Sequence, residues 1–339
     1  MLIIRPIQAG DFESLYQIAE ESGHGFTSLP VNADLLRHKI ARAEASFVKV
    51  IDKPFDEGYL MVLEDTATRE VVGTCAIEAA VGMEDAFYHY RLGTEVYHSE
   101  QIEVRNEVET LTLCHDYTGA AELCTLFLRE GYRKGNNGRM LSRSRFLFLA
   151  QHAKRFGETV IAEMRGVSDT AGNSPFYCWL QKNFLGIDFI QADYLSGLGK
   201  KAFMAEMMPR NPVYVCLLPE EAQKVIGEVH TNTRPALSLL QAEGFRCRGY
   251  VDIFDGGPTV ECRLTDIRAV RESRLLTVDI GEMLESDKQF IVSNTQLANY
   301  RATSACLAVD DNTEQVVISP ELAEGLLLAK GDQIRILAM

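Results

Sequence analysis

Short apolar segments alternate along this chain with stretches in which apolar residues recur at helical spacing, and this alternation predicts a mixed α/β fold. Strands are expected at Leu2–Pro6, Tyr59–Glu64, Val71–Ala80, Glu109–His115, Glu122–Leu128 and Thr159–Met164. Helices are expected after Asp11 as the capping residue, from Asn32 to about Ala45, over Met140–His152 and over Ser174–Phe184. The aromatic segment Gly82–Gln101 predicts irregular structure.

The chain repeats part of this pattern after residue 195. We expect strands at Lys201–Met208, Pro212–Leu218, Tyr250–Phe254 and Pro258–Cys262, a helix at Pro219–Ile226, and a helix within His230–Phe245 that ends at a glycine cap. From Asp266 onward the pattern changes to short β segments with one helical turn at Glu321–Leu326. These changes predict three domains, at residues 1–195, 196–265 and 266–339.

The composition narrows the classes of partner. The 339 residues include 48 Asp and Glu against 34 Lys and Arg, a net charge of −14 at pH 7. A broad nucleic-acid interface requires a basic face, so we expect no nucleic-acid partner, whereas an acidic protein tolerates a cationic substrate. No apolar run approaches the roughly 20 residues of a membrane span. We therefore expect no membrane partner.

Two further patterns bear on compartment and metal binding. The amino-terminal segment lacks the basic-then-apolar order of a secretory signal, so the cytoplasm is the expected compartment. The 8 cysteines occur singly, without a Cys-x-x-Cys pair or a Cys/His cluster at zinc spacing. The sequence predicts no metal site.

The segment after the expected strand Glu122–Leu128 has the composition of an anion-binding turn. It runs Tyr-Arg-Lys-Gly-Asn-Asn-Gly-Arg over residues 132–139 and leads into a predicted helix. Backbone N–H groups of such a turn, together with the helix dipole, bind phosphate. By itself the turn also fits an ordinary strand-to-helix connection with a solvated basic face.

The spacing within this turn excludes two common phosphate motifs and resembles a third. Neither the P-loop nor the dinucleotide-binding run of glycines is present. Arg133-x-x-Asn136-x-Gly138 instead resembles the pyrophosphate loop of the GNAT acyltransferase superfamily, with Asn136 at the place of the middle glycine. We expect Asn136 to replace that glycine because asparagine tolerates a left-handed backbone.

Longer runs over nearly the whole chain resemble those of the arginine N-succinyltransferase family. They are Thr27–Pro30, Asp116–Gly119, Glu122–Leu128, Leu141–Phe146, Ala162–Gly166, Ile226–His230 and Tyr250–Pro258. The resemblance implies a GNAT-like α/β fold: a mixed, mostly antiparallel sheet with flanking helices, a second, partial GNAT-like unit and a small β-rich C-terminal domain. It also implies transfer of succinyl from succinyl-CoA to the α-amine of L-arginine, the first step of arginine catabolism by the succinyltransferase route. Succinyl-CoA would then be a co-substrate, with no permanently bound cofactor.

The resemblance also assigns site residues. The family's succinyl-CoA contact falls on Leu126, and its catalytic histidine falls on His230. An imidazole that titrates near neutrality can return a proton to a departing thiolate, although His230 alone also fits a histidine near a helix start. The remaining residues expected along the CoA track are Phe127, Leu128, Arg133, Lys134, Gly135, Asn136, Asn137 and Gly138.

Recognition of the acceptor is less determined by the sequence. A guanidinium requires a carboxylate partner, and a substrate carboxylate requires a cation. The candidates are His115, Glu122, Glu163 and Arg165, each of which also fits a structural role such as a strand cap or an ion pair. Alternatives are another amine such as ornithine, acetyl-CoA as the donor, or a non-catalytic module that binds CoA or an amino acid. The family also implies a homo-oligomer or a complex with a related subunit.

Overall fold

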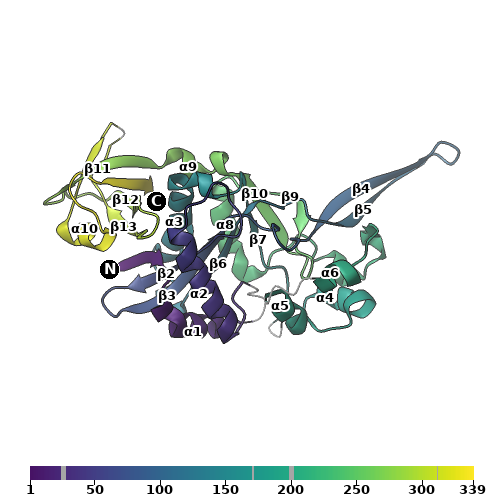
Figure 1. The fold of residues 1–339 in the computed structure, drawn as a ribbon. Helices are drawn as coiled ribbons and strands as arrows, with labels where there is room; N and C mark the ends of the chain where they lie inside the picture. Colours follow the sequence, from purple (N-terminus) through teal and green to yellow (C-terminus); the bar gives the residue numbers. More distant parts are fainter. Residues whose placement is uncertain (24–27, 170–171, 198–201, 311) are drawn as a thin grey trace.

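The computed structural model describes residues 1–23, 28–169, 172–197, 202–310 and 312–339 of an elongated molecule (Figure 1). Its described strands form one continuous sheet. In spatial order they are β14 (Gln315–Ile318), β11 (Arg274–Ile280), β15 (Gln333–Ala338), β12 (Gln289–Asn294), β13 (Ala302–Cys306), β1 (Leu2–Pro6), β2 (Gly58–Asp65), β3 (Glu70–Glu78), β6 (Ala121–Leu128), β7 (Thr159–Glu163), β10 (Pro258–Arg263), β9 (Arg246–Val251), β4 (His89–Ser99), β5 (Val104–Cys114) and β8 (Val213–Tyr214). Only the pairs β6–β7 and β11–β14 are parallel, which confirms the predicted mixed, mostly antiparallel sheet.

Helices cover both faces of the central strands. Along β2, Met61 and Leu63 pack in the apolar cluster that contains α3 (Asn137–Gln151). The alternate residues Leu60 and Val62 pack in the cluster that contains α1 (Phe12–Ser22) and α2 (Ala33–Val48). Because successive side chains of a strand point to opposite faces, α3 lies on one face of the sheet and α1 and α2 lie mainly on the other. No described helix is long and apolar enough to cross a bilayer.

The C-terminal region extends this sheet and also packs on the body. Strands β11 to β15 and α10 (Pro320–Leu326) enclose a core of their own. The side chain of Tyr300, from that region, extends to α3. It donates a hydrogen bond of 2.8 Å to the Ser144 carbonyl, and its ring lies 4.9 Å from that of Phe148. The region is therefore attached through side-chain packing on α3 as well as through strand pairing.

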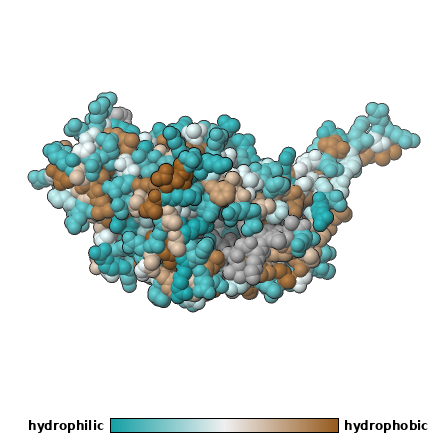
Figure 2. Space-filling view, viewed as in Figure 1, coloured by the Kyte–Doolittle hydropathy of each residue, from teal (hydrophilic) through white to brown (hydrophobic). Residues whose placement is uncertain are grey.

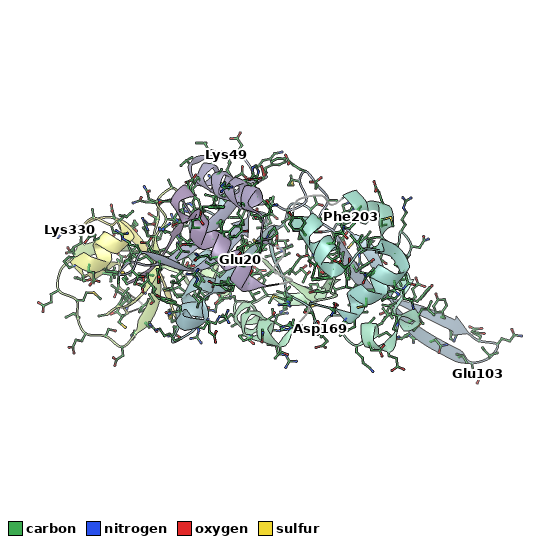
Figure 3. All side chains as sticks on the ribbon, turned by 90° about the horizontal axis from the view of Figure 1, so that it is seen from below. Glu20, Lys49, Glu103, Asp169, Phe203 and Lys330 are labelled. Atoms are coloured by element: carbon green, nitrogen blue, oxygen red, sulfur yellow. The ribbon has the colours of Figure 1, made fainter. Side chains whose placement is uncertain are left out.

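A long hairpin projects from the opposite end of the molecule. Strands β4 and β5 pair along their whole length. Their base pairs with β9 and β8, and their outer part stands clear of the body (Figures 1 and 2). Figure 3 shows Glu103 at the tip of the hairpin and Lys330 at the far, C-terminal end. The prediction of irregular structure over Gly82–Gln101 was wrong for β4, because pairing with β5 satisfies a backbone whose own apolar pattern is interrupted by Gly93.

Four predictions in the second half of the chain require correction. The expected strand Tyr250–Phe254 begins earlier, as β9, and residues 252–254 belong to the turn that follows it. The expected strand Lys201–Met208 is a helix, α6 (Ala202–Met207), in which alanine, methionine and glutamate favour helix over strand. The expected strand Pro212–Leu218 retains only β8, and a short 3-10 turn follows it. The expected helix Pro219–Ile226 is reduced to α7 (Glu220–Gln223).

The other described helices of this half are α4 (Pro175–Leu180), α5 (Phe189–Gly197), α8 (Arg234–Ala242) and α9 (Arg268–Glu272). The glycine cap predicted after α8 is present, since Gly244 has a φ of 103°. Asp11 does not cap α1 with its side chain, because its carboxylate accepts hydrogen bonds from Arg5 and from the Gln8 amide. The run Thr27–Pro30 begins at a residue outside the described ones, and the three-domain division remains a prediction.

Candidate active site

The parallel strands β6 and β7 separate shortly after they begin. Their described ladder consists of the pairs Ala121–Val160 and Glu122–Ile161. From Leu123 onward β6 continues against β3, while β7 pairs with β10 on its other side. The carboxyl ends of parallel neighbours lie at the same edge of a sheet. The candidate site is therefore the place at the carboxyl ends of β6 and β7 where the described ladder ends, and there the backbone of β6 is suited to pair with a ligand.

A bulge in β6 follows the end of this ladder. Between the pairs Ala76–Cys124 and Thr74–Phe127, the single residue Cys75 opposes two residues of β6, Thr125 and Leu126. Thr125 has a φ of 55°, which is uncommon for a β-branched residue, and its carbonyl accepts a hydrogen bond of 3.0 Å from the Thr74 hydroxyl. Bulges of this kind redirect backbone groups beside active sites. Leu126 is thus at the point where the backbone of β6 changes direction.

The predicted anion-binding turn follows β6 directly and ends at the first residues of α3. None of the described residues accepts a hydrogen bond from the amides of Gly135, Asn136, Gly138 or Arg139. These amides occupy consecutive or nearly consecutive positions before and within the first turn of the helix, where the helix dipole is positive. The arrangement is suited to bind a phosphate or pyrophosphate.

The left-handed residue of this turn is Gly135, with a φ of 55°, and not Asn136, whose φ is −101°. The expectation that Asn136 needs a left-handed backbone was therefore wrong. The side chain of Asn136, through Nδ2, donates a hydrogen bond of 2.6 Å to Oε1 of Gln289 at the start of β12, while its backbone N–H has no acceptor among the described residues. The C-terminal region thus supports the anion-binding turn directly.

Two cations of the turn are held near the end of β6. Arg133 Nε donates a hydrogen bond of 2.7 Å to the Leu128 carbonyl, and its guanidinium lies 5.6 Å from the centre of the Phe127 ring. Lys134 Nζ lies 5.8 Å from the Tyr132 ring. Both side chains are exposed, so they remain accessible to an anion beside the free amides.

His230 lies at the β7 side of the candidate site. Its amide donates a hydrogen bond of 2.9 Å to the carbonyl of Arg165, just past the end of β7, and the preceding residue Val229 forms a β-bridge with Gly166. Its Nδ1 accepts a hydrogen bond of 3.1 Å from the Asn232 amide, which leaves Nε2 as the nitrogen directed to other partners. Burial, and secondarily the Arg165 charge, lower the pKa of His230 below its ordinary value. The imidazole is therefore mostly neutral at pH 7.

A tight turn after β9 holds the backbone that carries His230. Asp255 accepts hydrogen bonds from the amides of Gly166 at 2.6 Å and of Gly257 at 2.8 Å. A Cβ on Gly257 would lie 2.1 Å from the Met164 carbonyl, so only glycine permits this approach. Burial raises the pKa of both Asp252 and Asp255, and the Asp255 charge raises the pKa of Asp252 further. The turn fixes residues 164–166, and through them His230.

Two of the predicted acceptor-binding carboxylates lie on these same strands. Glu122 of β6 is directly opposite Glu78 of β3, and both are partly buried. Glu163 ends β7, and its Oε1 lies 3.0 Å from Nε2 of the buried His89, at an angle that is not that of a hydrogen bond. His89 was missed by the sequence analysis, since it lies in the segment predicted to be irregular. Tyr117 and Phe87 surround its ring at centroid distances of 4.9 and 5.0 Å.

The remaining predicted residues are divided between two places. Arg165 is adjacent to His230 as described, and its Nη2 donates a hydrogen bond of 3.0 Å to the Ser168 hydroxyl. His115 is exposed in the turn before β6, at the amino-terminal end of the strand. Among the described residues, no hydrogen bond, ion pair or ring contact connects His115 with His230 or with the anion-binding turn. The structure therefore places Arg165 beside His230, whereas the Glu163 carboxylate lies beside His89 and His115 lies in a separate turn.

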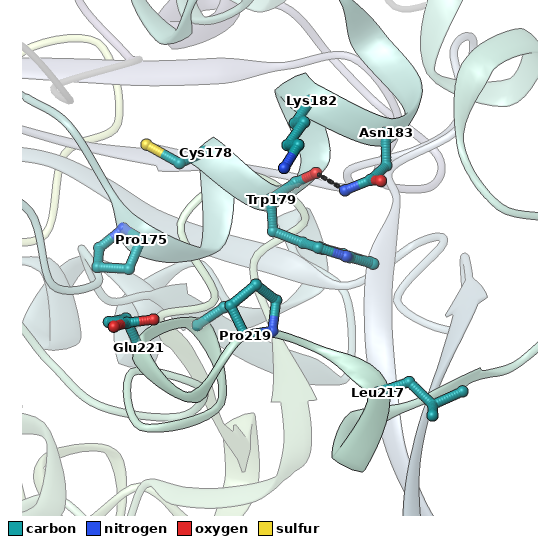
Figure 4. A pocket seen from close by; sticks show the side chains of 9 residues that line it. Pro175, Cys178, Trp179, Lys182, Asn183, Leu217, Pro219 and Glu221 are labelled. Atoms are coloured by element: carbon teal, nitrogen blue, oxygen red, sulfur yellow. Dashed lines mark hydrogen bonds between the residues drawn. The ribbon is translucent and has the colours of Figure 1, made fainter.

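A well-formed pocket of the described residues lies outside this site. It has a volume of about 410 Å³ and is lined mainly by α4 and α7, with Trp179, Leu217 and Pro219 on its walls (Figure 4). Asn183 donates a hydrogen bond of 2.7 Å to the Trp179 carbonyl at its rim. None of the predicted site residues lines this pocket, so it is separate from the candidate site.

Comparison with known proteins identifies the family of this chain. Residues 2–269 match the family described as arginine N-succinyltransferase beta subunit, and residues 274–338 match the C-terminal domain of that subunit. The chain is 45% identical to arginine N-succinyltransferase of Escherichia coli (strain 55989 / EAEC) over 340 residues, covering 100% of this chain and 98% of that protein. It is 46% identical, with the same coverage, to arginine N-succinyltransferase of Salmonella schwarzengrund (strain CVM19633).

A solved structure extends the agreement to the fold. Arginine/ornithine succinyltransferase subunit AI from Pseudomonas aeruginosa superposes with a TM-score of 0.92 at 38% sequence identity, covering 100% of this chain and 98% of that chain. The resemblance found in the sequence is thereby confirmed. The chain belongs to the arginine N-succinyltransferase family.

Proposed function

We propose that this chain transfers a succinyl group from succinyl-CoA to the α-amine of L-arginine and releases N2-succinyl-L-arginine and CoA. Its family consists of acyltransferases, so an acyl-CoA is the co-substrate. The observation that carries the proposal is the separation of β6 and β7, with free amides after β6 on one side and His230 beside the end of β7 on the other. A thioester is already activated, and such an arrangement supplies the alignment that its aminolysis requires.

The donor would lie along β6. Backbone groups of Leu126, Phe127 and Leu128 would pair with the pantetheine amides as an added strand pairs with a sheet edge. The free amides of residues 135–139 and the side chains of Arg133 and Lys134 would hold the pyrophosphate. This leaves the thioester carbonyl beside the Thr125 bulge, where an amide near Leu126 would donate to the developing oxyanion.

The chemical step needs one proton carrier. The neutral α-amine attacks the thioester carbonyl, and the tetrahedral intermediate holds an extra proton on nitrogen and a negative charge on oxygen. Neutral His230 takes that proton, and the imidazolium gives it to the thiolate as the C–S bond breaks. The lowered pKa of His230 suits this sequence of steps, because the side chain begins neutral and, once protonated, is a stronger acid than an ordinary imidazolium.

The acceptor would lie on the face of the sheet that carries Glu122 and Glu163. Their carboxylates, with Glu78 beside Glu122, give this face the negative charge that a guanidinium requires. Arg165 would be available to a substrate carboxylate near His230. His115, which lies in a separate turn, would contribute only through the neighbouring Asp116, whose carboxylate accepts a hydrogen bond of 2.8 Å from Tyr250.

The test is a donor and acceptor panel on the purified chain. Thiol release with succinyl-CoA and L-arginine, with the product identified by mass, should give the highest kcat/KM of the panel. Ornithine is the second candidate acceptor, because the Pseudomonas relative is named for both amino acids. Binding of CoA without thiol release would instead support a non-catalytic module and contradict the proposal.

The cellular setting completes the proposal. We place the reaction in the cytoplasm, in arginine catabolism, as the sequence predicts. We also propose an oligomer, either of this chain or with a related subunit, because the Pseudomonas relative is named as a subunit. Light scattering of the purified chain, alone and with its paralogue where one exists, tests that part.

A further inference from the structure

A small cavity lies on the α2 side of the sheet next to the Thr125 bulge. Helix α2 contributes Lys39 and Arg42 to its lining, β3 contributes Ala76 and Glu78, and β6 contributes Thr125. Its volume of about 20 Å³ admits one small polar group and not a whole substrate, since a single water needs about 10–15 Å³. The cavity can therefore hold one functional group of a substrate whose remainder lies outside it.

The two cations that line this cavity differ in their partners. Arg42 forms ion pairs with Glu78 and, at 3.7 Å, with Asp56, and it also donates a hydrogen bond of 2.8 Å from Nε to the Asp56 carbonyl. Lys39 is partly buried, and none of the described carboxylates lies within ion-pair distance of its amine. The Arg42 charge is thus matched by two carboxylates, whereas no carboxylate of the described residues matches the Lys39 charge at ion-pair distance. A partly buried ammonium of this kind favours an anionic partner.

The cavity is close to the proposed reacting atoms. Thr125 lines it, and the next residue is Leu126, where the thioester carbonyl is proposed to lie. Each substrate carries a carboxylate near its reacting atom. The terminal carboxylate of a succinyl group is two methylenes from the thioester carbonyl, and the α-carboxylate of an amino acid is one carbon from the attacking amine.

We propose that Lys39 binds a substrate carboxylate at this cavity and thereby selects a carboxylated substrate over its neutral analogue. The inference rests on the proposed acyl transfer and deepens it. Arg42 and Glu78 form the wall that positions Lys39, while the ammonium donates to the carboxylate. The chemistry is the same for the succinyl carboxylate and for the α-carboxylate of the acceptor, so the experiment must separate these two sources.

The experiment compares Lys39→Met with the wild-type chain on paired substrates. Succinyl-CoA is paired with butyryl-CoA, which has the same number of acyl carbons and no carboxylate. Arginine is paired with agmatine, which lacks the α-carboxylate. Two ratios are measured: kcat/KM for succinyl-CoA over that for butyryl-CoA, and kcat/KM for arginine over that for agmatine. We expect one of these two ratios to fall about 10- to 100-fold in Lys39→Met, the range for loss of a charged hydrogen bond. A fall in the donor ratio assigns the succinyl carboxylate, and a fall in the acceptor ratio assigns the α-carboxylate.

Controls keep the outcome interpretable. Lys39→Arg should retain most of the affected ratio, because the charge remains. Lys53→Met, at an exposed lysine beyond the end of α2, should change neither ratio. Lys39→Gln serves as a second uncharged variant if the methionine variant does not fold. If Lys39→Met or Lys39→Gln is folded and active and both of its ratios equal those of the wild-type chain, the inference is overturned. Absence of succinyl transfer by the wild-type chain would overturn the proposed function instead.

Discussion

The two sides of the candidate site at the ends of β6 and β7 are built in different ways. The donor side consists of the end of β6 and the turn at residues 133–139, which are close in sequence and present backbone amides and cations. The acceptor side consists of residues 163–166, His230 and the turn at residues 252–257, which are joined by a β-bridge and by the hydrogen bonds of Asp255. One side is continuous chain, and the other is an assembly of three distant segments.

This difference shows what each side tolerates. Backbone amides bind phosphate whatever their side chains are, provided that the turn keeps its conformation. A proton-transferring imidazole must instead be held at a defined position, so it depends on the packing of every segment around it. We therefore expect side-chain changes on the acceptor side to alter kcat strongly, and conformational changes on the donor side to alter KM for the acyl-CoA.

The largest effect should come from His230→Ala. Removal of the proton carrier should lower kcat about 10²- to 10⁴-fold, the usual contribution of general acid–base catalysis, with little change in KM for succinyl-CoA. Steady-state kinetics measure both parameters. His98→Ala, at an exposed histidine of the hairpin, is the matched control. A near-wild-type kcat in His230→Ala would remove this residue from the mechanism.

The next effect concerns the turn that holds His230. Asp255→Ala leaves the amides of Gly166 and Gly257 without their acceptor, which should lower the free energy of unfolding by about 2 kcal/mol and lower kcat as well. Thermal unfolding and kinetics on the same preparation measure the two losses. Asp255→Asn retains one oxygen and should lose less. Loss of stability with an unchanged kcat would show that the turn does not position His230.

On the donor side, Gly135→Ala tests the conformation of the turn. Gly135 has a φ of 55° and open space around its Cβ position, so alanine should cost about 1 kcal/mol of backbone energy and raise KM for succinyl-CoA about 5-fold. Gly131→Ala is the matched control, since its Cβ would also meet nothing and its φ is not positive. Equal effects of the two variants would contradict the prediction, as would a change in KM for arginine alone.

The smallest effect should be on pH dependence. Arg165 is the second cause, after burial, of the lowered pKa of His230, so Arg165→Met should raise that pKa toward its ordinary value. Activity requires neutral His230 at the start, and the acidic limb of the kcat/KM profile should therefore move to higher pH. Arg105→Met, at the exposed tip of the hairpin, should leave the limb in place. If the acidic limb of the kcat/KM profile stays in place in Arg165→Met, Arg165 does not affect the pKa of His230.

The sequence anticipated the elements around the site better than the contacts within it. The strand before the turn, the helix after it and the glycine-capped helix α8 all follow from local patterns. The role of Gly135 was assigned to Asn136, because spacing alone does not show which residue takes the left-handed conformation. His89, Lys39 and the bulge at Thr125 carry no local signal, since each matters only through a neighbour on another strand or helix.

The sequence by itself determined the family, the acidic surface and the strand–turn–helix unit whose amides face an anion, because these depend on composition or on consecutive residues. Only the tertiary structure decided where β6 and β7 separate, that Asp255 holds Gly166, and that His230 lies beside the end of β7. Those features join residues that are 39 to 89 positions apart. Their geometry follows from the packing of the whole sheet, which no local pattern along the chain encodes.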